Sequence, residues 1–127
     1  MSQNISDQVK MAKEGIDNLT PQQVEQELAD GALLVDIRES EEREAAGTIP
    51  GAVHAARGML EFYADPASPY HRVEFEPERR VILHCAGGAR SALGVVALQN
   101  LGFHNVAHLD GGFKAWVAAG NRTDVAR

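Results

Sequence analysis

The chain has 127 residues, which fits one domain built around one hydrophobic core. Apolar residues make up 44% of the chain, charged residues make up 24%, and the formal net charge is -6. This acidic balance argues against nucleic acids and anionic membrane surfaces as partners, although a local field could still attract a small anionic substrate. A single cysteine, Cys85, cannot form an internal disulfide, so the fold requires no oxidising compartment.

The N-terminal residues predict a helical extension before the main domain. The first ten residues are polar, so we expect no signal peptide, and no apolar run approaches the length of a membrane span. These features favour a soluble, cytoplasmic protein. Ile5, Val9, Ala12 and Ile16 recur at helical spacing and predict an amphipathic helix within residues 1–18. Such a helix packs on the domain, frays or mediates association, and a packed or frayed extension is the favoured interpretation.

The main domain is expected to span residues 19–120 and to begin with a helix. Thr20 suits an N-cap, Pro21 suits the first helical position, and Gln23 completes a capping box. The continuous apolar run at 32–37 then predicts a strand that is covered on both faces.

Shorter elements are predicted next along the chain. A helix begins at Ser40 and ends at Gly47, and a Pro-Gly turn with a short extended piece covers 48–55. One or two helical turns follow at 58–66, and residues 67–78 read as a surface loop.

The C-terminal half repeats the alternation of strand and helix. Buried strands are predicted at 81–85 and 106–109, and helices at 91–101 and 112–120, with a loose tail at 121–127. The buried side of the first of these helices is expected to carry Leu93, Val96, Ala97 and Leu101.

This alternation predicts the α/β class, with a small, mostly parallel central sheet and helices on both faces. In such folds a site lies beyond the carboxyl ends of the strands, which is where Cys85 falls.

The stretch HCAGGARS, residues 84–91, has the composition of a reactive loop. A helix that begins near Ser91 and the cation of Arg90 would both favour a thiolate on Cys85. Gly87 and Gly88 would let the backbone curl so that its N–H groups converge on an anion. The alternative is an inert cysteine that serves as packing at a strand end.

Three motifs of the chain resemble motifs of the rhodanese family and occur in the same order as in that family. CAGGARS resembles its active-site loop, Cys-x-x-x-x-Arg, and LLVDIRESEEREAAGTIPGAVHA resembles its upstream signature. LGFHNVAHLDGGFKAW resembles its downstream signature, so that the resemblance covers nearly the whole of residues 19–120. Thr48 stands where the family often has a histidine.

The resemblance implies a rhodanese-like fold and a thiosulfate sulfurtransferase activity. Cys85 would be the nucleophile and would carry a persulfide between a sulfane donor, such as thiosulfate, and a cyanide or thiol acceptor. The acceptor would come from outside, as a small molecule or a protein, and no metal or organic cofactor would be needed. The persulfide and substrate would be held by the loop residues Ala86, Gly87, Gly88, Ala89, Arg90 and Ser91.

Two other functions remain open from the sequence. Phosphatases and arsenate reductases also combine a cysteine, a backbone cradle and an arginine, but the related phosphatases have five residues between Cys and Arg, whereas this loop has four. A non-catalytic or sulfur-delivery binding module is the other alternative, although the presence of Cys85 weakens the non-catalytic form.

Side chains around the loop have alternative roles as well. Asp36 and Arg38 match the family's Asp-x-Arg and either shape the site or, as we favour, brace the strand end. Arg90 either binds substrate or braces the loop. His84 is a poor base for Cys85, since adjacent strand residues point to opposite faces. Because Ala86 and Ala89 are small and neutral, thiosulfate would rely on Arg90 and the backbone amides alone, and we expect its affinity to be weak.

Overall fold

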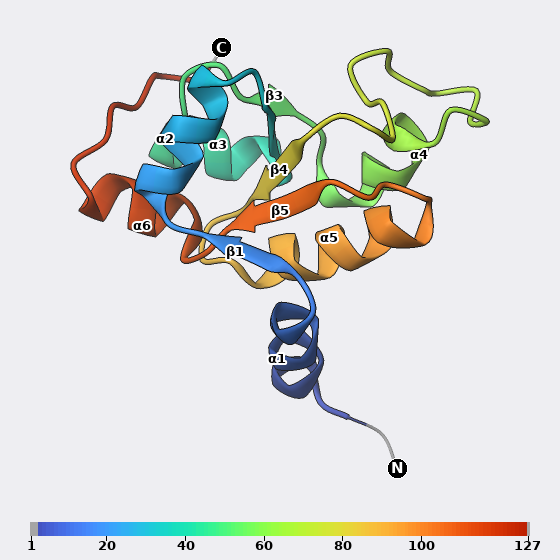
Figure 1. Ribbon diagram of the computed structural model, residues 1–127. Helices are drawn as coiled ribbons and strands as arrows, with labels where there is room; N and C mark the ends of the chain where they lie inside the picture. The colour runs from blue at the N-terminus through green and yellow to red at the C-terminus, as the bar shows by residue number, and fades with distance from the viewer. Residues whose placement is uncertain (1–2, 127) are drawn as a thin grey trace.

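The computed structural model describes residues 3–126, which form a five-stranded sheet with helices on both faces (Figure 1). All neighbouring strands are parallel, so the predicted α/β architecture is confirmed. In spatial order the strands are β1 (Asp17–Leu19), β5 (Val106–Leu109), β4 (Val81–His84), β2 (Leu33–Asp36) and β3 (Val53–His54). The sequence predicted β2, β4, β5 and the extended piece at β3, but not β1.

The helices agree with the predicted elements to within a few residues. None of those in residues 3–126 combines the length and apolar character that crossing a membrane requires. In chain order they are α1 (Ile5–Glu14), α2 (Pro21–Ala29), α3 (Ser40–Ala46), the 3-10 turn Arg57–Met59 with α4 (Leu60–Ala64), α5 (Ala89–Asn100) and α6 (Gly112–Ala118). The predicted capping box of α2 is present, with the Thr20 hydroxyl accepting from the Gln23 N–H.

The sheet divides the core into two layers, and the alternation of side chains along β4 sorts residues between them. Leu83 and Cys85 belong to the layer under α4 and α5, whereas Ile82 belongs to the layer under α2 and α6. Cys85 therefore lies on the α5 side of the sheet, and the intervening His84 lies on the α6 side, where it stacks on Phe113.

The predicted buried side of α5 is wrong in part. The buried residues of α5 are Ser91, Ala92, Gly94, Val95 and Leu98. The predicted residues Leu93, Val96, Ala97 and Leu101 are half-buried instead. The physical reason is that α5 packs on α1 and α4 as well as on the sheet. Leu93 and Val96 line a shallow hollow with Met11 and Ala12 of α1.

The loop at 67–78 has no regular structure, as predicted, but it is not wholly a surface feature. Phe75 is completely buried in the core layer under α5 and anchors the loop. The guanidinium of Arg72 also donates a hydrogen bond of 2.8 Å to the carbonyl of His54, which ties the loop to β3.

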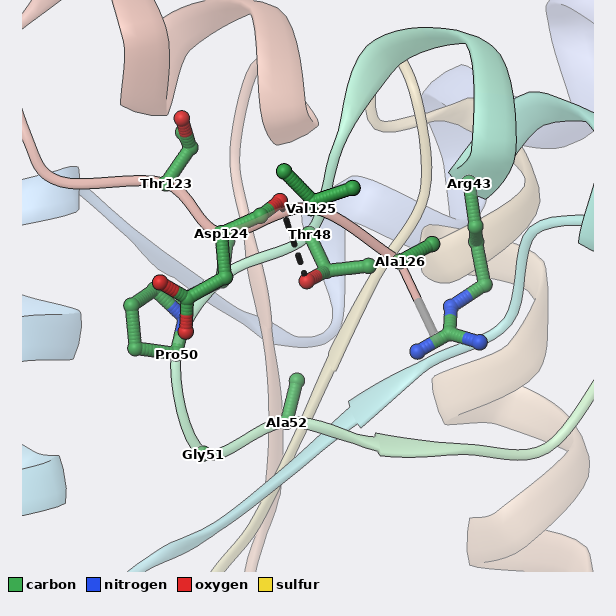
Figure 2. Close-up of a pocket in the computed structure, with 10 residues that line it drawn as sticks. Arg43, Thr48, Pro50, Gly51, Ala52, Thr123, Asp124, Val125 and Ala126 are labelled. Atoms are coloured by element: carbon green, nitrogen blue, oxygen red, sulfur yellow. Dashed lines mark hydrogen bonds between the residues drawn. The ribbon is translucent and has the colours of Figure 1, made fainter.

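The C-terminal segment is not loose, contrary to the prediction. Thr48 and Asp124 exchange two backbone hydrogen bonds of 2.8 Å, forming an isolated antiparallel bridge, and Figure 2 shows the additional bond from the Thr48 hydroxyl to the Asp124 carbonyl. Trp116 Nε1 donates to the carbonyl of Arg122 at 2.8 Å. A cavity of about 480 Å³ lies between this segment and residues 48–52, and Arg43 also lines it (Figure 2).

Candidate active site

The loop that follows β4 places the cysteine at the carboxyl edge of the sheet. Cys85 is 1% exposed and lies directly between the end of β4 and the start of α5. The helix begins at Ala89, two residues earlier than predicted, so that Gly88 is its N-cap with φ of 101°. A Cβ at Gly88 would lie 3.0 Å from the amide nitrogen of Gly111. Gly88 is therefore required both for its left-handed backbone and for the close approach of the Gly111 segment.

The sulfur of Cys85 accepts hydrogen bonds from the backbone of the helix that follows it. The N–H of Gly88 lies 3.2 Å from Sγ, and the N–H of Ser91 lies 3.4 Å from it. Both amides belong to the six loop residues, 86–91, that the sequence predicts to hold the persulfide and the substrate. Both belong to the unpaired N–H groups at the start of α5, where the helix dipole favours negative charge. The site can thus stabilise a thiolate or another sulfur anion with backbone donors.

The N-terminus of α6 fixes the other side of the loop. Phe113 N–H donates to the carbonyl of Cys85 at 2.8 Å, and Lys114 N–H donates to the carbonyl of Ala86 at 3.1 Å. This contact requires glycine at position 112, because a Cβ there would lie 2.6 Å from the Cys85 carbonyl oxygen. The Gly-Gly of the downstream motif therefore allows α6 to hold the cysteine loop.

Arg90 is engaged by a carboxylate on α3. Its two terminal nitrogens donate to the two oxygens of Glu42, each at 2.8 Å. This pairing raises the pKa of Arg90 and lowers the pKa of Glu42 to about 2, with the hydrogen bond between them as the largest cause of both shifts. Arg90 thus links the cysteine loop to α3, while its charge remains close to the loop and partly exposed.

Asp36 and Arg38 form a buried ion pair at the end of β2. Arg38 Nε and Nη2 donate to the two carboxylate oxygens at 3.0 and 2.8 Å, and Arg43 Nε donates to the same carboxylate at 3.1 Å. Burial raises the pKa of Asp36, but the hydrogen bond from Arg38 and the nearby positive charges outweigh it, so the pKa is lowered. Arg38 also lies 4.3 Å above the ring of Phe113, which connects this pair to α6.

His84 lies on the far side of the sheet from the sulfur. Its Nε2 is 3.7 Å from Asp36 and, among the atoms of residues 3–126, has no hydrogen-bond partner. Burial lowers the pKa of His84 to about 4, so that the ring is neutral at physiological pH. Across the same part of the chain, no three His, Cys, Asp or Glu side chains gather as metal ligands.

A second buried histidine, which the sequence interpretation passed over, lies on the same side as the sulfur. Nδ1 of His108, in β5, forms a hydrogen bond of 2.8 Å with the hydroxyl of Ser91. That hydroxyl lies 3.5 Å from Cys85 Sγ. Its Nε2 lies 2.7 Å from Oδ1 of Asn18 in β1. Strand alternation places His108 on the opposite face of the sheet from Ala107 and Leu109. This alternation could have shown from the sequence that His108 faces the same side as Cys85.

Comparison with known proteins places this geometry in a family. The model of the rhodanese-like domain matches residues 20–119. A sulfurtransferase of Allochromatium vinosum is 32% identical over 107 residues, which cover 83% of this chain and 92% of that protein. A thiosulfate sulfurtransferase of Ectopseudomonas mendocina is 31% identical over 100 residues, covering 79% of this chain and 84% of that protein.

A solved structure matches almost the whole chain. It is a protein of unknown function from Rhodopseudomonas palustris, described as a possible tyrosine phosphatase, with 38% identity and a TM-score of 0.91 over 98% of this chain and 96% of that one. The family model, the curated relatives and the cysteine loop agree, and the chain belongs to the rhodanese-like domain family.

Proposed function

We propose that this protein is a sulfurtransferase that carries a sulfane sulfur as a persulfide on Cys85. The observation that carries the proposal is the pair of N–H groups, from Gly88 and Ser91, that converge on the sulfur at the start of α5. The four residues between Cys85 and Arg90 make a tight cradle whose size suits one additional sulfur atom. The sulfurtransferase names of the curated relatives support the same activity.

The reaction proceeds by two displacements at sulfur. In the first, the thiolate of Cys85 attacks the outer sulfur of thiosulfate, a sulfur–sulfur bond forms, and sulfite leaves with the electron pair of the bond that breaks. In the second, cyanide or a thiolate attacks the outer sulfur of the persulfide, and Cys85 leaves as a thiolate. Since the sequence has one cysteine, the acceptor is an external molecule, either a small thiol, cyanide or a protein thiol.

The same proposal extends to organisation and location. Residues 19–120 would form the catalytic domain, with an N-terminal helical extension at 1–18 and a C-terminal tail at 121–127. Residues 1, 2 and 127 lie outside the described part of the chain. A lone thiol that must remain reduced fits the cytoplasm. The acidic net charge fits small anions and thiols as partners better than nucleic acids or membranes.

Intact mass after incubation with thiosulfate tests the proposal. We expect the wild type to gain the mass of one sulfur atom, cyanide to remove it with formation of thiocyanate, and Cys85→Ser to gain nothing. An unmodified wild type with thiosulfate, with polysulfide and with a mercaptopyruvate-type donor contradicts the proposal.

The phosphatase alternative is kept because of the Rhodopseudomonas palustris protein. It predicts hydrolysis of an aryl phosphate that vanadate inhibits and that Cys85→Ser abolishes, with no persulfide. A third result, neither persulfide nor hydrolysis with a folded protein, would indicate a non-catalytic binding module.

A further inference from the structure

A continuous chain of hydrogen bonds runs from the sulfur of Cys85 across the α5 side of the sheet. It passes from Sγ to Ser91 Oγ, from Ser91 Oγ to His108 Nδ1, and from His108 Nε2 to Asn18 Oδ1, with separations of 3.5, 2.8 and 2.7 Å. Cys85, Ser91 and His108 are buried, with exposures of 1%, 0% and 0%. Three elements that are distant in sequence, β1, α5 and β5, meet to build it.

Backbone carbonyls at the end of α1 determine which atom donates in each hydrogen bond of this series. The side-chain Nδ2 of Asn18 donates to the carbonyls of Lys13 and Ile16 at 2.9 and 3.1 Å, so the other atom of that amide, Oδ1, faces His108. Since Oδ1 only accepts, Nε2 of His108 carries the ring proton and Nδ1 is an acceptor. The hydroxyl of Ser91 consequently donates to Nδ1 and presents its oxygen lone pairs to the thiol of Cys85.

We propose that Cys85 is deprotonated through this chain: Ser91 Oγ takes the thiol proton while it passes its own proton to Nδ1 of His108, which Asn18 holds in the accepting tautomer. The S–H bond of Cys85 breaks, an O–H bond on Ser91 re-forms, and an N–H bond forms on His108. His108 becomes an imidazolium that donates to both Asn18 and Ser91. The proton returns by the same route when Cys85 is released as a thiolate, so one turnover consumes no proton.

Every polar group in the chain is satisfied both before and after the transfer. Afterwards the Ser91 hydroxyl donates to the thiolate, which adds a third donor to the two amides that already face the sulfur. The proton that leaves Cys85 thus stays on His108, on the other side of Ser91. The negative thiolate and the positive imidazolium stabilise each other across the Ser91 hydroxyl. Ser91 contacts the reacting sulfur, whereas His108 and Asn18 act through it as positioning residues.

The charged groups around His108 come from several elements. Burial lowers the pKa of His108 to about 4, the carboxylate of Asp110 at the end of β5 opposes this shift, and Lys13 of α1 adds to it. Lys13 and Asp110 pair with each other at 3.0 Å and shift the pKa of His108 in opposite directions. From the β4 and α5 side the titratable group is Cys85 itself, since Arg90 is paired with Glu42. His108 is therefore neutral near pH 7, with the Nδ1 lone pair facing the Ser91 hydroxyl, and its lowered pKa makes the imidazolium a short-lived species that lasts only while the thiolate forms.

The test is the pH dependence of Cys85 alkylation by iodoacetamide, followed by intact mass. Cys85 is the sole cysteine, so the signal is unambiguous, and no sulfur donor is needed. The inference rests on the proposed function, because sulfur transfer is what uses the thiolate. Alkylation involves no persulfide, so a failure of the relay and a failure of persulfide formation are separate results. His108→Gln keeps hydrogen-bonding groups but removes the base, Ser91→Ala breaks the bridge, and His104→Gln makes the same change at an exposed position.

If the relay operates, His108→Gln and Ser91→Ala slow alkylation at pH 7 by roughly tenfold or more, as loss of an acid–base group does, and their rates approach the wild-type rate at high pH, where hydroxide removes the proton. His104→Gln leaves the profile unchanged. A decrease of equal size at every pH indicates a structural role and overturns the relay, as does an unreactive wild-type thiol at pH 7. Nitrogen-15 spectra of the wild type provide a check that needs no variant: a proton on Nδ1 rather than Nε2 of His108 also overturns it.

Discussion

Arg90 and Glu42 form a two-pronged ion pair that joins the cysteine loop to α3, with both contacts at 2.8 Å. The arginine beside the candidate nucleophile is thus neutralised by a carboxylate 48 positions away in the sequence. A doubly charged donor that enters the loop must compete with Glu42 for Arg90, which strengthens the expectation of weak thiosulfate binding.

Glu42→Gln should free Arg90 for an anionic donor. We expect the KM for thiosulfate to fall roughly three- to tenfold with little change in kcat, since a partly exposed ionic contact contributes on the order of 1 kcal/mol. Steady-state kinetics with thiosulfate and cyanide would measure it. Glu41→Gln, an exposed position on the same helix, is the control for net charge. An equal effect of both substitutions would mean that bulk charge, and not Arg90, is responsible.

Gly88→Ala should destabilise the loop, because Gly88 has φ of 101° and a Cβ there would press on the Gly111 amide at 3.0 Å. We expect a loss of about 1–3 kcal/mol in the free energy of unfolding. Urea unfolding followed by the fluorescence of the single tryptophan, Trp116, measures it. The matched control is Gly87→Ala, which has no heavy atom within 4 Å of its Cβ position and whose φ is not positive, so that its stability should stay within about 1 kcal/mol of wild type. Equal losses at the two positions would contradict this account of the loop.

Stability should fall as the pH drops from 7 to 5. The pKa values of His84 and His108 are lowered from 6.5 to about 4 in the folded state, so in this window the unfolded chain binds more protons than the folded one. The expected loss is about 2 kcal/mol for each histidine. Asp36 and Glu42, whose pKa values are lowered, add their own losses at still lower pH.

Urea unfolding at pH 7 and pH 5 checks this dependence. His108→Gln removes one of the two titrating rings and should roughly halve the loss, whereas His104→Gln, at the exposed position, should not change it. A stability that is the same at both pH values would refute the burial of neutral histidines.

Removal of residues 122–127 should expose Trp116. The truncation deletes the Arg122 carbonyl that accepts from Trp116 Nε1 and the Asp124 partner of Thr48. We expect a loss of about 1–3 kcal/mol in the free energy of unfolding, because a buried donor loses its acceptor, together with a red shift of the fluorescence. Arg122→Ala keeps the carbonyl and should leave both unchanged. An unchanged spectrum in the truncated protein would show that the tail does not cover Trp116.

Local signals predicted the frame of the molecule. The continuous apolar runs predicted β2 and β4, and the Thr20–Gln23 capping box predicted the start of α2. The glycines that follow Cys85 predicted the loop between β4 and α5. Each of these features depends on residues that are close in sequence, where spacing alone reports the geometry.

What the sequence left undetermined depends on tertiary pairing. β1 has three residues, two of them exposed and polar, so neither its length nor its alternation marks a strand. The partners of Arg90 and His108, Glu42 and Asn18, come from remote elements, and no spacing rule connects them. The buried side of α5 was predicted wrongly for the same reason, since a helix that packs on other helices as well as on the sheet has no single apolar stripe.

The pairing of β1 with β5 also bears on how the protein is made. Among the five strands of this sheet, β1 is synthesised first and β5 last, and Asn18 and His108, which join them, lie 90 positions apart. Such non-local pairing slows folding, because the chain must close a long loop before the contact forms. β2 and β4 can associate earlier in synthesis, whereas β1 and the helix α1 that precedes it have no neighbouring strand until β5 has been translated.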